Sequence, residues 1–262
     1  METLFKTLMV DLKDHVAVVR MNRSETMNAL EYQLRVDLVD CFRGLSEYDD
    51  VRVVILTGIG KAFSAGGDLR ELGQRMNVDR ARRYVLHVSK VILAIQNLEK
   101  PVIAAVNGAA MGAGFSIMMA CDLVVASEKA KFSQAFVKVG LVPDLGATYF
   151  LPRLVCLQKA KELVFTGQVL SAHELKDLGL INYLVPHEDL EKKAFELARR
   201  IAEGPPLALG SAKKLLNKSL NFSLEEMLEI EAQSQAACMQ SEDHMEGIAA
   251  FYEKRKSHFR GK

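Results

Sequence analysis

The sequence predicts an α/β protein with a parallel β-sheet core over residues 1–200 and a helical region over residues 201–262. Three observations support this fold class. The apolar runs of the first two thirds are short and continuous, as in strands that are buried on both faces. Segments with helical apolar spacing separate these runs, as in a sheet covered by helices. The last third shows helical patterns alone.

In the first part, each expected element begins and ends at recognisable residues. The strand VRVVIL runs into the glycine-containing turn Thr57–Gly60, and Pro101 ends a long helical pattern because proline cannot continue a helix. The expected strands are His15–Met21, Val51–Leu56, Val102–Val106 and Leu123–Ala126, and the expected helices are Glu31–Leu45 and Arg80–Leu98.

The C-terminal region is expected to contain helices only. Ser223 followed by Glu226 has the spacing of a capping box, which marks a helix start. Pro205 and Pro206 form the expected hinge between the two parts of the chain. The expected helices are Leu190–Ile201, Pro206–Leu220, Ser223–Cys238 and Glu242–Tyr252.

Composition excludes several classes of function. The 262 residues are 49% hydrophobic and 26% charged with a net charge of +1, which argues against nucleic acid or an anionic membrane as the main partner. The basic clusters at residues 80–83 and 254–256 are typical of solvated surfaces. Charges interrupt the N-terminal apolar residues, and no apolar run is long enough to span a membrane.

The four cysteines are widely scattered and contain no CxxC pair. This pattern disfavours a zinc site or a disulfide framework and favours buried, reduced thiols. No cluster of histidines and cysteines indicates any other metal site. Together with the N-terminal sequence, these features predict a cytoplasmic protein.

Two segments rich in small residues carry the functional signal. AFSAGGDLR (residues 62–70) follows one expected strand, and NGAAMGAG (residues 107–114) follows another. Small residues let another molecule approach the main chain, and the first N–H groups of a helix favour negative charge. Two such N–H groups that converge would form an oxyanion hole.

Either segment alone is a weak signal, because most glycine-rich turns only let a helix pack on a sheet. Neither has the GxxxxGK[ST] pattern of a P-loop, and MGAG lacks the GxGxxG spacing of dinucleotide-binding proteins. These two kinds of nucleotide binding are therefore disfavoured.

At these segments the sequence resembles the crotonase superfamily, also called the enoyl-CoA hydratase/isomerase family. The resemblance extends over almost the whole chain and includes MNRSETMNAL, KPVIAAVNGAAMGAGFSIMMACDLVVAS, AFVKVGLVPDLGATYFLPRLV and FYEKRKSHF. It implies a (ββα) spiral core with a C-terminal helical trimerisation region, and a homotrimer or a dimer of trimers. The substrate would be a coenzyme A thioester, with no permanently bound cofactor and no metal.

The resemblance also assigns roles to particular residues. The N–H groups of Gly67 and Ala113 would form the oxyanion hole, where many family members have glycine in place of Ala113. Phe251 and Lys254 would reach the adenine and the 3′-phosphate of coenzyme A bound to a neighbouring subunit. The residues that contact the rest of coenzyme A in the family correspond to Arg23, Ala65, Asp68 and Leu69.

The reaction is the point at which the sequence departs from the family's hydratases. Their two water-activating glutamates correspond to Ser116 and Phe136, and neither residue is acidic. Asp144 matches the aspartate of members that shift double bonds, and the surrounding sequence is closest to the ring-opening isomerases of phenylacetate degradation. One carboxylate is enough to remove a proton from one carbon and return it to another. From its position alone, Asp144 could instead be an N-cap, and Ser116 could bond to its own helix backbone.

The favoured hypothesis is therefore an enoyl-CoA isomerase with Gly67, Ala113, Asp144 and Ser116 at the active site. A hydratase of an unusual enoyl- or dienoyl-CoA ester, with Asp144 activating water, is the first alternative. A binding module that holds acyl-CoA without turnover is the alternative from another class. The sequence does not distinguish the acyl group.

Overall fold

Two β-sheets form the centre of the protein, which a computed structural model describes over residues 5–262. The larger sheet has six strands in the order β1-β2-β3-β5-β7-β10, and the smaller has the order β4-β6-β8-β9. The strands are β1 Leu8–Lys13, β2 Val16–Met21, β3 Val53–Gly58, β4 Ala62–Ser64, β5 Val102–Val106, β6 Ala109–Met111, β7 Leu123–Ser127, β8 Lys131–Ser133, β9 Leu170–Ser171 and β10 Tyr183–Val185.

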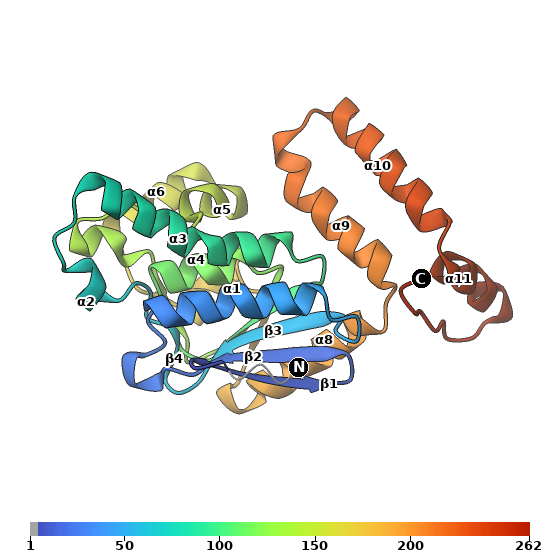
Figure 1. Ribbon diagram of the computed structural model, residues 1–262, viewed down its shortest axis with the longest axis horizontal. Coiled ribbons are helices and arrows are strands. Elements are labelled where there is room, and N and C mark those ends of the chain that lie inside the picture. Colours follow the sequence, from blue (N-terminus) through green and yellow to red (C-terminus); the bar gives the residue numbers. More distant parts are fainter. Residues whose placement is uncertain (1–4) are drawn as a thin grey trace.

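Helices cover the sheets and form the whole C-terminal region (Figure 1). The α-helices are α1 Tyr32–Ser46, α2 Leu69–Leu72, α3 Val78–Asn97, α4 Ala113–Ala120, α5 Ala147–Leu154, α6 Leu157–Thr166, α7 Ala172–Asp177, α8 Leu190–Ala202, α9 Pro206–Lys218, α10 Leu224–Met239 and α11 Glu242–Glu253. Four 3-10 helices are η1 Ser24–Thr26, η2 Ala135–Val139, η3 His187–Asp189 and η4 Ser219–Asn221.

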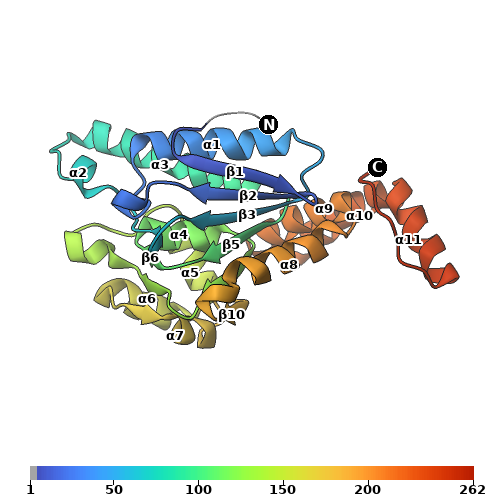
Figure 2. The ribbon, with the colours of Figure 1, turned by 90° about the horizontal axis from the view of Figure 1, so that it is seen from below.

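The central strands β3, β5 and β7 of the larger sheet are buried on both faces, which explains their continuous apolar sequences. Along β3, Val53 and Ile55 belong to the apolar cluster that contains α8, whereas Val54 and Leu56 belong to the larger cluster that contains α1, α3 and α4. Successive side chains of a strand point to opposite faces. An apolar residue is therefore needed at every position, and Figure 2 shows α1 and α8 on opposite sides of these strands.

From β3 to β8, consecutive strands alternate between the two sheets, and this alternation builds the (ββα) spiral. β3, β5 and β7 are parallel neighbours in the larger sheet, and the strands that follow them, β4, β6 and β8, are parallel neighbours in the smaller one. Helices α2, α4 and α5 then follow these pairs along the chain. The segments after β4 and β6 are therefore brought side by side, and they contain the two small-residue turns.

Most of the predicted elements are confirmed to within two residues, and β5 matches its predicted bounds. Three differences are informative. Strand β3 continues through Gly58, where a turn was predicted, and β1 is an antiparallel edge strand that the sequence analysis did not identify. The whole smaller sheet was also missed, because its strands have two or three residues and short elements show no periodicity.

The C-terminal helices extend away from the sheets (Figures 1 and 2). Helix α9 is joined to the core by the buried Lys213, which pairs with Asp122 at 2.7 Å. Helix α10 begins with the predicted capping box of Ser223 and Glu226. None of the helices in residues 5–262 combines the length and the hydropathy that a membrane span requires.

The cysteine prediction is confirmed in part. Cys41 and Cys121 are buried and free, and burial raises the pKa of Cys41 to about 12. Cys156 is exposed and Cys238 is half-buried, so burial was the wrong expectation for these two.

Candidate active site

The two small-residue turns are in direct contact. A side-chain carbon on Gly66 would lie 2.5 Å from the carbonyl oxygen of Met111 and 3.2 Å from the amide nitrogen of Ala113. Likewise, a side-chain carbon on Gly114 would lie 2.3 Å from the carbonyl oxygen of Ser64. Only glycine permits this approach, because any Cβ at these positions would overlap the backbone of the facing turn.

Each turn presents an N–H group that no other group of the described chain uses. Gly67 precedes Asp68, the N-cap of α2, and Ala113 is the first residue of α4. Within residues 5–262, neither amide donates a hydrogen bond. Because Ala113 is helical and its N-cap Gly112 takes the positive φ of 48°, an alanine fits where many family members have glycine.

A cavity of about 190 Å³ connects these amides to a carboxylate. Gly67, Ala113 and Asp144 all line it, so three of the predicted catalytic residues are brought together. The remaining walls are mostly apolar, as in sites that bind small organic groups. They include Leu30, Leu69, Leu72, Tyr84, Val88, Met111, Phe136, Val139, Leu141 and Leu145.

Asp144 is half-buried, and one oxygen of its carboxylate has no hydrogen-bond partner. Burial raises its pKa to about 6, and a hydrogen bond from its own backbone N–H opposes this only partly. The Oδ1 atom is buried without a hydrogen-bond partner. The alternative that Asp144 caps the following helix is wrong, because Gly146, with φ of 76° and no side chain, is the N-cap of α5.

The two positions that correspond to the hydratase glutamates have different surroundings. Ser116 is fully buried, and its hydroxyl is 3.1 Å from the carbonyl oxygen of Asp144 and 3.3 Å from that of Gly112. It does not line the cavity. Phe136 lines it, with its ring over Gly112. Asp144 is thus the one acidic residue among those that line this cavity.

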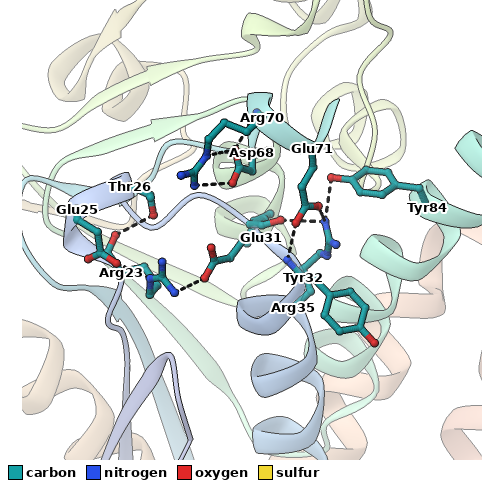
Figure 3. Close-up of polar contacts among 11 residues, drawn as sticks. Arg23, Glu25, Thr26, Glu31, Tyr32, Arg35, Asp68, Arg70, Glu71 and Tyr84 are labelled. Atoms are coloured by element: carbon teal, nitrogen blue, oxygen red, sulfur yellow. Dashed lines mark hydrogen bonds and ion pairs between the residues drawn. The ribbon is translucent and has the colours of Figure 1, made fainter. Parts of the chain in front are cut away.

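Two of the residues assigned to coenzyme A, Arg23 and Asp68, are held by ion pairs (Figure 3). Arg23 contacts Glu25 at 2.5 Å and also Glu31. Asp68 accepts hydrogen bonds from the backbone and the guanidinium of Arg70, which lower its pKa, and it caps α2 as expected of a helix-start residue.

Ala65 and Leu69 line the cavity, and the side chain of Leu69 is 62% exposed. An exposed leucine beside two free amides offers an apolar surface to a bound molecule. Phe251 and Lys254 lie elsewhere. They are exposed residues at the end of α11, far from α2 and α4 in both views (Figures 1 and 2).

Sequence reasoning missed a buried charged network beside the cavity. The Arg35 guanidinium donates to Glu71 and to the hydroxyl of Tyr84, both at 2.9 Å, and to the carbonyl oxygen of Leu30 at 3.0 Å (Figure 3). The same guanidinium lies 5.8 Å from the ring of Tyr32. Arg35 follows the buried Leu34 in α1, but the apolar pattern of the helix predicts a surface position for an arginine there. The sequence therefore carried no clear signal that Arg35 is buried.

Among residues 5–262, no group of three or more histidine, cysteine or acidic side chains is arranged to hold a metal ion. The residues that line the cavity offer the carboxylate of Asp144, the amine of Lys138, the hydroxyl of Tyr84 and the main chain of Gly67 and Ala113 to a bound molecule. These groups suit the stabilisation of an oxyanion and the transfer of a proton.

Comparison with known proteins identifies relatives over nearly the full length. Residues 11–262 match the family model described as enoyl-CoA hydratase/isomerase. The short-chain-enoyl-CoA hydratase of Clostridium acetobutylicum is 36% identical over 95% of each chain. The 1,2-epoxyphenylacetyl-CoA isomerase of Escherichia coli is 35% identical over 94% of this chain and 95% of its own. The crystal structure of an enoyl-CoA hydratase from Bacillus anthracis aligns with a TM-score of 0.94 at 36% identity, over 98% of this chain and 100% of that one.

Proposed function

The chain belongs to the enoyl-CoA hydratase/isomerase family, and we propose that within this family it shifts a double bond in an enoyl-CoA thioester. The thioester oxygen is held by the N–H groups of Gly67 and Ala113. The Asp144 carboxylate removes a proton from the carbon next to the double bond, and the electron pair moves onto the thioester oxygen to give a dienolate. The resulting carboxylic acid returns the proton to the other end of the dienolate.

The presence of a single carboxylate in the cavity is the observation that supports this proposal. A proton shift needs one group that acts as base and then as acid, and a pKa of about 6 suits both roles near neutral pH. Each oxyanion donor typically contributes ~2.7–4 kcal/mol to related acyl chemistry. Ser116 serves as a positioning residue, because its hydroxyl holds the main chain at Asp144.

Hydration is the second candidate, and the names of several relatives, which are hydratases, favour it. In that reaction Asp144 would activate a water molecule, for which its unpaired Oδ1 is available. The position of Phe136 counts against it, since an aromatic ring replaces the second water-holding group. The third candidate, an acyl-CoA-binding module without turnover, gives the carboxylate in the cavity no chemical role.

One experiment separates these three candidates. The purified protein is incubated with a 3-enoyl-CoA and with a 2-enoyl-CoA in heavy-oxygen water. Migration of the double bond without label uptake is the expected result, whereas label uptake without migration would identify a hydratase. Asp144→Asn should abolish turnover and retain coenzyme A affinity, and the exposed Asp177→Asn should change neither. Binding without turnover in the wild type would support the third candidate.

We further propose that residues 201–262 are the oligomerisation region of a homotrimer or a dimer of trimers. Exposed apolar side chains of α10 and α11, including Leu224, Leu228, Phe251 and Tyr252, support this assignment, since such side chains are typical of interfaces. Phe251 and Lys254 would then reach coenzyme A on a neighbouring subunit. Light scattering tests the oligomer, and Lys254→Gln should weaken binding of coenzyme A more than of its 3′-dephospho form.

A further inference from the structure

Tyr84 is shared by two neighbouring hollows. It lines the cavity that contains Gly67, Ala113 and Asp144. It also lines a second hollow of about 440 Å³, which is bounded by α1, the segment between α2 and α3, and α3 itself. Tyr84 is the only residue common to the two linings, so its ring stands between the two spaces.

The ring of Tyr84 is held in place from one side. The Arg35 guanidinium is 2.9 Å from the Tyr84 hydroxyl and 4.7 Å from the ring centroid. Arg35 is itself only 3% exposed and is fixed by its ion pair with Glu71. Burial raises the pKa of the Tyr84 hydroxyl, so the group stays neutral and hydrogen-bonded at neutral pH. A side chain restrained in this way acts as a fixed wall.

Part of the cavity wall is formed by the packed core, whereas Leu69, Val139 and Leu141 are exposed. Val88, Ala113, Phe136 and Leu145 are all less than 10% exposed and belong to the main apolar core. Enlarging the cavity there would disturb close packing. Tyr84, in contrast, has the open second hollow behind it.

We propose that Tyr84 is the specificity-determining end wall of the acyl chamber and restricts the substrate to short or compact acyl groups. This inference rests on the proposed function, because it takes the cavity to be the acyl site. The small volume of the cavity, about 190 Å³, favours a compact acyl group. The second hollow is lined by the charged side chains of Arg35, Arg80, Arg83 and Glu71. An apolar acyl chain would gain little by entering it, because these groups would lose contact with water.

Binding of saturated thioesters tests the wall without requiring turnover. Calorimetry with butanoyl-, octanoyl- and dodecanoyl-CoA should show that affinity of the wild type falls as the chain lengthens. Tyr84→Ala removes the ring that closes the cavity. The affinity for dodecanoyl-CoA should then rise by about tenfold or more relative to the affinity for butanoyl-CoA, which is the gain expected when two or more further methylene groups are buried. Tyr84→Leu should give a smaller change in the same direction.

Tyr84→Phe is the matched control, because it keeps the ring and removes only the hydroxyl. Its preference for short chains should remain. Circular dichroism shows whether the variants are folded, and Tyr84→Leu keeps the test informative if the alanine variant is not. Chain-length profiles of folded Tyr84→Ala and Tyr84→Leu that superimpose on the wild type would overturn the inference. A wild type that binds no acyl-CoA would refute the proposed function itself.

Discussion

The carboxylate of Asp144 is expected to lower the free energy of unfolding of this protein. Folding transfers this group into a mostly apolar cavity, where Oδ1 finds no hydrogen-bond partner. Asparagine has nearly the same shape and carries no charge. Asp144→Asn should therefore raise the free energy of unfolding at neutral pH while it removes the proton-transfer group.

The size of the effect follows from the pKa. Burial raises the pKa of Asp144 to about 6 in the folded protein. In the unfolded chain the ordinary value of ~3.9 applies, and the difference corresponds to ~3 kcal/mol of burial cost for the charged form. Because the cavity mouth admits water, a gain of ~1–3 kcal/mol is expected from the substitution.

The sign of the pH dependence is fixed by the same values. Below pH ~4 the carboxyl group is neutral in both the folded and the unfolded state, so its burial does not lower the free energy of unfolding. Above pH ~6 it is ionised in both states, and the full cost of burying the charge applies. The stabilisation by Asp144→Asn should therefore be present at pH 8 and absent at pH ~4.

Urea unfolding at both pH values and at a fixed protein concentration measures this difference. Asp177→Asn, which alters an exposed carboxylate, is the control and should leave stability unchanged within ~0.5 kcal/mol at both pH values. Equal stability of wild type and Asp144→Asn at pH 8 would show that the carboxylate is well solvated, and the reasoning about the cavity would be wrong.

Three further predictions concern the mechanism and the packing around it. In the proposed isomerase, kcat/KM should rise as the pH rises through about 6, since only the ionised Asp144 can accept a proton, and a flat profile would exclude Asp144 as the base. Lys213→Ala should cost ~3 kcal/mol in urea unfolding, because it leaves Asp122, whose side chain is only 19% exposed, without its cation, and Lys213→Met with Asp122→Asn should recover most of this loss. Gly114→Ala should cost ~1–3 kcal/mol in thermal unfolding and reduce turnover, since its Cβ would overlap Ser64, whereas Gly247→Ala has ordinary space and should be tolerated.

The larger elements could be predicted because their residues repeat with a clear period. Strand β5 is apolar at all five positions, and α10 begins with a capping box, so local chemistry alone defines both. The strands β4 and β6 carry no such signal in their three residues each. Their pairing, which brings Gly66 against Ala113, is a long-range contact that the resemblance supplied and periodicity could not.

The candidate site could likewise be predicted only in part from the sequence. The turns and Asp144 could be identified from the sequence, but the role of Asp144 could not be separated from capping until Gly146 proved to be the N-cap of α5. Arg35 was missed because a single arginine in a helix usually faces solvent. Its three acceptors come from the loop before α1, from α2 and from α3, and only the tertiary fold brings them together.

The burial of α4 has a consequence for how the protein moves. All eight residues of this helix are buried, and its first amide is one of the two that face the cavity. The inner amides of such a helix exchange their hydrogens with water only when the whole core opens. The main chain of Ala113 is therefore carried by a buried, rigid element of the core. Movement is easier on the opposite side of the cavity, where the side chain of Leu69 is 62% exposed to solvent.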